Sequence, residues 1–233
     1  MPNDNTETVI LPTREGYDAW SEIYDDDDNP LIALEERLIH QLMGELSGRT
    51  VANVGCGTGR HAIRMANAGA RVTAIDFSQR MLEKAYRKPG AKQVTFLKHD
   101  LAKPLPVDTG TFDIVTCCLV VDHIADLEGF FGELGRICRP DGSILISVMH
   151  PAMMLRGVQA RFTDPTTGQV TRPDSRPHQI CDYVMSALAA GLTIDRMSEH
   201  PVDEALAAIS PRSVRYVGWP LLLLLRLKKL GAP

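Results

Sequence analysis

The sequence predicts an α/β fold built on a seven-stranded, mostly parallel sheet with helices on both faces. Three observations predict it. Short apolar runs alternate with segments of helical periodicity along most of the 233 residues. The first apolar run breaks into a turn with Gly55, Gly57 and Gly59 and continues directly into an amphipathic segment. Polar residues follow the later runs at the points where parallel strands would end.

An aromatic segment precedes the first core element. Tyr17, Trp20 and Tyr24 are three of the chain's five Tyr and two Trp residues. An aromatic segment of this kind is expected to pack on the rest of the protein, either as a cap across a ligand cleft or as a terminal helix attached to the core domain. We expect residues 1–29 to form an N-terminal cap segment whose first residues, Met1 to Thr8, are disordered.

A run of four carboxylates, Asp25 to Asp28, follows. Contiguous carboxylates point in divergent directions and rarely converge on one cation, so we interpret the run as a solvated loop and expect no metal site. Asp28 or Asn29 then caps a helix that has Pro30 at its first position and runs to about Leu46. Leucines at helical spacing along this helix predict a face buried in the core.

The other elements follow from apolar runs and turn residues. Strands are expected at Thr50 to Val54, Arg71 to Ile75, Val94 to Lys98, Phe112 to Cys117, Ser143 to Val148, Leu192 to Ser198 and Leu221 to Leu227. Helices are expected at Arg60 to Ala68, Ser78 to Tyr86, Leu127 to Cys138 and His178 to Ala190, with a turn at Arg139 to Gly142. Residues 151–177 break the alternation and are interpreted as a lid inserted after the fifth strand, within a single domain of residues 1–233.

Charge and cysteine usage argue against several classes of function. The net charge of −4 leaves no basic footprint, which disfavours a nucleic-acid partner and favours a small-molecule substrate. The five cysteines form no Cys-x-x-Cys pair, so neither a zinc site nor a disulfide framework is predicted, and we expect a cytoplasmic protein. The strongest apolar run, Leu221 to Leu225, is far shorter than the ~20 residues that span a bilayer. We expect a monomer or a homodimer without membrane contact.

The glycine-rich turn indicates a ligand that touches the backbone, because glycines permit positive φ and carry no Cβ. Arg60 stands where the dinucleotide fingerprint has its third glycine, and no Gly-Lys-Ser/Thr follows, so neither a nicotinamide site nor a P-loop is predicted. Asp76 follows the second strand about 20 residues after Gly55, the distance at which nucleotide-binding α/β folds place an acid against ribose. Its alternative role is to cap the next helix.

The turn sequence Asn53-Val54-Gly55-Cys56-Gly57-Thr58-Gly59 resembles the first motif of the class I S-adenosylmethionine (SAM) dependent methyltransferases, small-molecule enzymes of type 11 among them. Asn53 occupies the position that is usually acidic. The Phe112-Asp113 pair and the segment from Cys138 to Gly142 also match that family, and the resemblance covers roughly Tyr17 to Leu227. It implies a Rossmann-like fold and SAM as the cofactor.

The resemblance implies a cofactor site at successive strand ends. Asp100 and the backbone of Leu101 would hold the adenine, Phe77 would lie against its face, and Asp76 would accept hydrogen bonds from the ribose. The complete set of expected cofactor-binding residues is Tyr24, Asn53, Gly55, Cys56, Gly57, Asp76, Phe77, Asp100, Leu101 and Cys118.

Two histidines are candidates for acid–base catalysis, since imidazole exchanges a proton around neutrality. His123 follows the fourth strand and His150 the fifth, so both would open onto the acceptor side of the cleft. Each also has a structural interpretation, His123 as a helix cap and His150 as a residue that orders the lid. The residues expected to bind the substrate are Tyr17, Trp20, His123, His150 and His178.

The sequence thus predicts transfer of a methyl group from SAM to oxygen, nitrogen or carbon of a small organic molecule. Two alternatives stay open. One is a catalytically silent SAM-binding subunit of a complex, which Asn53 favours. The other is an RNA methyltransferase with a basic face formed by Arg156, Arg161, Arg172 and Arg176. A nicotinamide oxidoreductase is disfavoured by Arg60 and by the lack of a Tyr-x-x-x-Lys hydride site.

Overall fold

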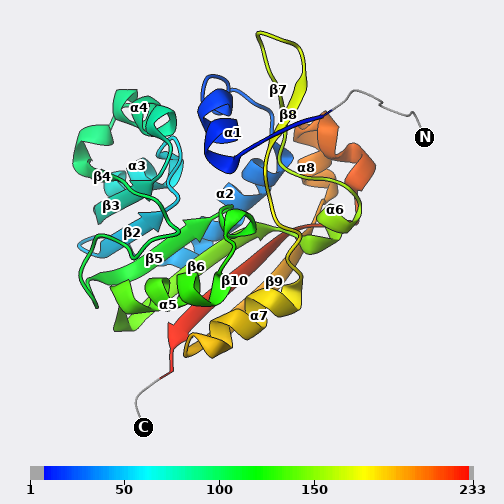
Figure 1. The fold of residues 1–233 in the computed structure, drawn as a ribbon. Helices are drawn as coiled ribbons and strands as arrows, with labels where there is room; N and C mark the ends of the chain where they lie inside the picture. Colours follow the sequence, from blue (N-terminus) through cyan, green and yellow to red (C-terminus); the bar gives the residue numbers. More distant parts are fainter. Residues whose placement is uncertain (1–7, 231–233) are drawn as a thin grey trace.

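A seven-stranded sheet forms the centre of the computed structural model, which describes residues 8–230 (Figure 1). Its strands are β2 (Thr50–Val54), β3 (Arg71–Asp76), β4 (Val94–Lys98), β5 (Phe112–Cys118), β6 (Cys138–Met149), β9 (Leu192–Pro201) and β10 (Pro220–Lys229). They lie in the order β4-β3-β2-β5-β6-β10-β9, and only β10 runs antiparallel to its neighbours. The mostly parallel sheet is confirmed. The strand order reverses between β2 and β5, which is where open α/β sheets bind ligands.

Helices cover both faces of this sheet. One face carries α2 (Pro30–Met43), α3 (Arg60–Asn67), α4 (Gln79–Arg87), α6 (Pro151–Leu155) and α8 (Glu204–Ile209), and the other carries α5 (Leu127–Ile137) and α7 (Ile180–Ala189). Leu222 and Leu224 pack in the first core, Leu223 and Leu225 in the second, and all four are buried. The apolar run is therefore the buried strand predicted. Between residues 8 and 230, no helix has both the length and the apolar character of a membrane span.

Helix ends follow local capping signals. Asn29 caps α2, since its side chain accepts a hydrogen bond from the backbone N of Leu31 at 3.0 Å, and Pro30 is the first helical residue as predicted. The helix ends at Met43, before the predicted Leu46, because Gly44 adopts φ of 67°. Ser78 caps α4 by accepting from the backbone N of Met81 at 3.1 Å.

Three residues of the carboxylate run at 25–28 accept hydrogen bonds from side chains elsewhere in the chain. Asp25 accepts from the Thr58 hydroxyl at 2.7 Å and from Lys88 at 2.8 Å. Asp27 accepts from Arg212 at 2.6 Å, and Asp28 from the hydroxyl of Ser210 at 3.3 Å. The side chains diverge as expected, and Asp25, Asp26 and Asp28 are exposed, as in a solvated loop, but the run also makes contacts with other parts of the chain. The run joins the cap segment to the glycine turn on one side and to the region after α8 on the other.

The predicted turn at Arg139 to Gly142 lies inside β6. The register between β5 and β6 shifts here, from Phe112 opposite Cys138 to Ile114 opposite Ser143, so the extra residues are absorbed as a bulge. Gly142 is required there, because a Cβ would lie 2.6 Å from the Sγ of Cys138. The Pro-Asp-Gly sequence does mark an irregularity of the backbone, but this irregularity is a bulge within β6 and the strand continues through it.

A second, smaller sheet lies over the carboxyl ends of the central strands (Figure 1). Its strands are β1 (Val9–Leu11), β8 (Val170–Pro173) and β7 (Phe162–Thr163), with β1 parallel to β8 and β7 antiparallel to it. Helix α1 (Thr13–Trp20) packs on the sheet, and Trp20 stacks on Phe162 with ring centroids 5.2 Å apart. The cap segment and the insertion after β6 thus form one structure over the carboxyl ends of the central strands. We call α1 together with the sheet β1-β8-β7 the roof. Residues 1–7, which hold most of the segment expected to be disordered, lie outside the described range.

Asp113 joins the starts of β2, β5 and β6. Its Oδ2 accepts from the backbone N and hydroxyl of Thr50, at 2.7 and 2.6 Å, and its Oδ1 accepts from Arg139 at 2.5 Å. Hydrogen bonds from Thr50, followed by that from Arg139, lower the pKa of Asp113 to about 2. Because an unfolded Asp titrates near ~3.9, this carboxylate stabilises the fold above about pH 4, and its contribution is lost as the pH falls through about 2.

Asp113→Asn is therefore expected to lower the free energy of unfolding at pH 7 by about 1–2 kcal/mol. It should also flatten the loss of stability between about pH 4 and 2, measured by urea unfolding at each pH. Asp141→Asn is the control for loss of one carboxylate, since Asp141 lies in the same bulge and is exposed. An Asp113→Asn variant with the wild-type acid dependence would contradict the prediction.

Candidate active site

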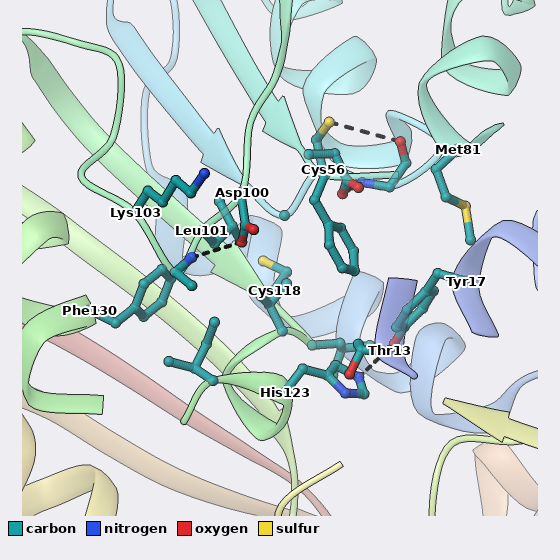
Figure 2. A pocket seen from close by; sticks show the side chains of 18 of the residues that line it. Thr13, Tyr17, Cys56, Met81, Asp100, Leu101, Lys103, Cys118, His123 and Phe130 are labelled. Atoms are coloured by element: carbon teal, nitrogen blue, oxygen red, sulfur yellow. Dashed lines mark hydrogen bonds between the residues drawn. The ribbon is translucent and has the colours of Figure 1, made fainter. Parts of the chain in front are cut away.

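A cavity of ≈ 530 Å³ opens at the carboxyl ends of β2, β3, β4 and β5, beneath α1. Figure 2 shows Asp100, Leu101 and Lys103 on one side of it, Thr13, Tyr17 and His123 on another, and Cys118 between them. All the predicted cofactor-binding residues except Asn53 line it: Tyr24, Gly55, Cys56, Gly57, Asp76, Phe77, Asp100, Leu101 and Cys118. The fold thus brings residues from four strand ends to one place.

The glycine turn after β2 forms one wall of the cavity. Gly55 and Gly57 adopt φ of 72° and 53°, a region that side chains rarely tolerate. A Cβ on Gly55 would lie 2.3 Å from the Cγ2 of Val120, whereas one on Gly57 would meet no atom within 4 Å. Gly55 is therefore needed for packing against the loop after β5, and the backbone of Gly57 is left open to a ligand.

Asp76, at the end of β3, holds this turn in place. Its Oδ2 accepts from the backbone N of Gly57 at 2.7 Å, and its Oδ1 accepts from the backbone N of Ser78 at 2.9 Å. Burial raises the pKa of Asp76, and these backbone hydrogen bonds oppose that rise. The cap of α4 is Ser78 and not Asp76, so the alternative role weighed for Asp76 does not account for its position.

The end of the cavity at Asp100 is closed by the cap helix. Asp100 Oδ1 accepts from the backbone N of Ala102 at 3.1 Å, and Oδ2 accepts from Arg14 at 3.4 Å. The Arg14 guanidinium also lies 5.4 Å from the centroid of the Phe77 ring. Nothing in the sequence pattern singled out Arg14, because its partners are more than sixty residues away along the chain.

Tyr17 and His123 meet at the opposite end (Figure 2). The Tyr17 hydroxyl lies 2.9 Å from His123 Nε2, and His123 Nδ1 lies 2.7 Å from the carbonyl oxygen of Asp174. A carbonyl only accepts, so Nδ1 carries a proton and Nε2 of the neutral ring accepts from Tyr17. Burial raises the pKa of Tyr17 well above its ordinary value, which keeps the hydroxyl protonated. The Asp122 carboxylate lies 3.9 Å from the same Nε2.

Three of the five residues predicted to bind the substrate do not line the cavity. Trp20 is part of the roof. His150 caps α6 by accepting from the backbone N of Ala152 at 3.1 Å, and its Nε2 lies 2.7 Å from Glu199. His178 Nε2 lies 2.9 Å from the carbonyl oxygen of Ile124, behind the cavity wall. The expectation that His150 opens onto the acceptor side is therefore wrong, because the ring is turned into a helix cap.

Asn53 is buried in the sheet away from the cavity. Its amide Nδ2 donates to the Thr116 hydroxyl at 3.1 Å, and its Oδ1 has no hydrogen-bond partner among residues 8–230. The predicted contact with the cofactor is absent in this arrangement, since the side chain faces β5.

Several cavity residues escaped the sequence analysis. Arg60 and His61 line the wall next to Cys56, and their position as the first two residues of α3 was a usable signal. Leu119 also lines the cavity and adopts φ of 57°, the only positive φ of a non-glycine residue within the described range. Such backbone strain concentrates at functional sites, but no sequence pattern announces it.

Comparisons with known proteins agree on one class of enzyme. Residues 52–146 match the family described as a methyltransferase domain. The chain is 28% identical to the uncharacterised methyltransferase AN0656 of Emericella nidulans, across 89% of this chain and 87% of that protein. It is 31% identical to the ubiquinone biosynthesis O-methyltransferase of Xanthomonas oryzae, over 46% of this chain and 45% of that protein. The chain thus matches about half the length of relatives with this name.

Solved structures share the fold. The crystal structure of an S-adenosylmethionine dependent methyltransferase from Mesorhizobium loti superposes with a TM-score of 0.70, at 20% identity, covering 84% of this chain and 97% of that one. At this identity the likeness establishes the architecture. The strand order of the sheet, the glycine turn and the matched domain all indicate the same fold.

Proposed function

Because the chain is a class I SAM-dependent methyltransferase, we propose that it methylates a hydroxyl group of a small organic molecule, with His123 as the general base. The observation that carries this proposal is the hydrogen bond between the Tyr17 hydroxyl and Nε2 of His123. It puts the Tyr17 hydroxyl against the His123 nitrogen that does not contact the Asp174 carbonyl.

The residues present fit the cofactor. Asp76 would accept from the ribose hydroxyls, Asp100 and the backbone of Leu101 would hold the adenine, and the open backbone of Gly57 would lie against the ligand. The turn from Gly55 to Gly59 contains no Lys or Arg, which agrees with a ligand that has no phosphate. When bound, SAM supplies a methyl group that is already activated for displacement.

His123 has the tautomer that a base requires. The Asp174 carbonyl holds the proton on Nδ1, which leaves the Nε2 lone pair directed at the hydroxyl of Tyr17. An acceptor hydroxyl that replaces the Tyr17 hydroxyl would give its proton to the same nitrogen as its oxygen attacks. The Asp122 carboxylate, 3.9 Å away, is then the counter-charge of the protonated ring. Base catalysis of this kind contributes ~10²- to 10⁴-fold in rate.

The surroundings of His123 favour a small and largely apolar acceptor. Ile124, the next residue along the chain, lines the cavity with it, Phe130 lines the side of Asp100 and Leu101 (Figure 2), and α1 lies above the cavity together with the sheet β1-β8-β7. The name of the Xanthomonas oryzae relative, an O-methyltransferase, supports oxygen as the methylated atom. Of the four arginines weighed for RNA binding, Arg156 is engaged within the chain, since it lies 4.3 Å from the Trp219 ring centroid.

The test is an acceptor screen in which each phenol is matched by the aniline of the same skeleton. The purified protein is incubated with SAM, and release of S-adenosylhomocysteine (SAH) is measured. We expect turnover with phenols and little with the matched anilines. Faster turnover of anilines would refute the hydroxyl acceptor. SAH binding without turnover of any acceptor would favour the silent SAM-binding subunit.

A further inference from the structure

Large apolar side chains are exposed on one side of the molecule, between the end of α6 and the start of β10. They are 38% to 75% exposed, and we call them the apolar face: Leu155, Val214, Val217 and Trp219. Leu155 is the last residue of α6, and the other three belong to the 3₁₀ helix at Pro211–Tyr216 and to the turn that follows it. Apolar residues exposed singly are common, whereas a group of them marks an interaction site.

Two arginines hold the parts of the apolar face together. The Arg156 guanidinium lies 4.3 Å from the Trp219 ring centroid and 5.3 Å from that of Tyr216. Arg215 lies 4.8 Å from the same Tyr216 ring. The backbone N of Trp219 donates to the carbonyl oxygen of Tyr216 at 2.8 Å, which fixes the turn. The end of α6 is therefore seated against residues 214–219.

The charged side chains in these segments are all positive. Residues 151–163 and 205–219 contain four arginines and no Asp or Glu. Asp27 neutralises Arg212 at 2.6 Å, on the side of the cap segment. Within residues 8–230, neither Arg156 nor Arg215 makes an ion pair, and both are exposed. The apolar face thus carries two uncompensated positive charges, although the chain as a whole has a net charge of −4.

This combination suits the surface of an anionic membrane. Tryptophan favours the level of the lipid headgroups, and arginine lays its apolar stem along such a surface while its charge meets the phosphates. We propose that the apolar face, together with Arg156 and Arg215, binds the protein to membranes that contain anionic phospholipids. The contact is peripheral, since no helix within the described range can span a bilayer. It revises the expectation of no membrane contact, which rested on the shortness of the apolar run.

Other occupants of the apolar face fit less well. A two-fold interface between copies places the same surface on both subunits, so Arg156 and Arg215 of each copy would face those of the other without an acid to pair. An RNA would bring its phosphates against Leu155 and Val214, which offer no hydrogen bond. A bilayer accommodates both the arginines and the aliphatic side chains.

The apolar face lies beside the roof. Helix α6 begins the insertion that also forms β7 and β8, and Figure 1 shows α6 and α8 at the same side of the molecule. Ser210 and Arg212 contact Asp28 and Asp27, at the end of the cap segment. A membrane bound here would hold an apolar acceptor close to the elements that cover the cavity. Membrane binding itself depends neither on the acceptor nor on His123.

The chain's two tryptophans allow a test without an activity assay. Trp219 is 44% exposed and Trp20 only 2%, so a change in tryptophan emission on membrane binding reports Trp219. Vesicles of phosphatidylglycerol and phosphatidylcholine in equal parts should shift the emission to shorter wavelength, and brominated acyl chains should quench it. Vesicles of phosphatidylcholine alone should bind at least ~10-fold more weakly. Trp219→Phe should still sediment with the anionic vesicles but show neither change in emission.

Matched variants test the two parts of the surface. Leu155→Glu should weaken binding to the anionic vesicles at least ~10-fold, and Arg156→Gln/Arg215→Gln ~10- to 30-fold. Met185→Glu is the control and should bind as the wild type does, since Met185 is 61% exposed on α7, which covers the other face of the sheet. None of these residues lines the cavity, so an unchanged calorimetric titration with SAH verifies that each variant is folded.

The proposal is overturned if the wild type does not bind the anionic vesicles, or if Leu155→Glu and Met185→Glu lose binding equally. Competition by inorganic phosphate or by RNA would also overturn it, because the arginines would then serve a free anion or a nucleic acid. A homodimer in analytical ultracentrifugation that Leu155→Glu dissociates would assign the apolar face to a second copy. Failure of the wild-type protein to turn over any acceptor would bear only on the proposed function.

Discussion

His123→Asn is expected to lower the rate of methyl transfer by ~10²- to 10⁴-fold while SAH binds as tightly as to the wild type. The asparagine amide can still donate to the Asp174 carbonyl, so the loop keeps its contact with the roof. What it loses is the Nε2 lone pair, which the acceptor hydroxyl needs as its proton acceptor. The measurement is a single-turnover rate at saturating SAM, together with a calorimetric SAH titration.

The control for this variant is Tyr17→Phe. It removes the hydroxyl that occupies Nε2 but keeps the ring, whose centroid lies 5.9 Å from that of Trp20. If Tyr17 only holds the place of the acceptor hydroxyl, Tyr17→Phe should retain activity close to wild type. A His123→Asn variant with an undiminished rate would exclude His123 as the base.

The architecture and most of the cofactor end could be predicted from local patterns. Parallel strands place their carboxyl ends at one edge of the sheet. Once three such strands are recognised in the sequence, Gly57, Asp76 and Asp100 are therefore expected to lie close together. Each of these residues lies at the end of its strand or within about three residues of it, and each lines the cavity. Periodicity and strand order are sufficient to bring such residues together.

What was missed are contacts between residues far apart along the chain. Glu35, which accepts from Arg60 in the cavity wall, was not expected at the site and meets Ser147 across 112 positions. Tyr17 and His123 were each expected there, but their hydrogen bond across 106 positions was not. In the sequence of its helix, Glu35 comes directly after Leu34 of the leucine stripe, and the helical pattern does not predict that its carboxylate is buried. His150 shows the reverse error: it follows a strand end, yet the next residue, Pro151, begins a helix that uses the imidazole as its cap. The place of a residue after a predicted strand shows that it lies at the carboxyl edge of the sheet, but it does not show in which direction its side chain points.

The roof could not be predicted for the same reason. Val9 pairs with Thr171 in a parallel register, and Gly16 packs so closely on Pro173 that a Cβ would lie 2.8 Å from its Cα. Three-residue strands carry almost no periodic signal, and their pairing depends on contacts across the whole chain. The cap and the insertion were each expected over the cleft, but not as one sheet.

Asp76→Ala is expected to weaken binding of SAH by about 3 kcal/mol, roughly 100-fold. The carboxylate holds the backbone N of Gly57 and of Ser78, and it is the acceptor expected to face the ribose. Its removal leaves the N–H groups of Gly57, in the glycine turn, and of Ser78, at the start of α4, without this acceptor, and it leaves the ribose hydroxyls without a charged partner. Asp76→Asn keeps the shape and one acceptor oxygen, so its loss should be smaller.

Two ligands that share the adenosine and the sulfur locate this effect: SAH carries the amino-acid part of the cofactor, and 5′-methylthioadenosine lacks it. Because Asp76 is expected to face the ribose, Asp76→Ala should weaken binding of SAH and of 5′-methylthioadenosine equally. Thermal unfolding of Asp76→Ala in the absence of ligand shows how much of the loss comes from the turn itself. Unchanged affinity for both ligands would remove Asp76 from the site, and a loss confined to SAH would place the ribose elsewhere.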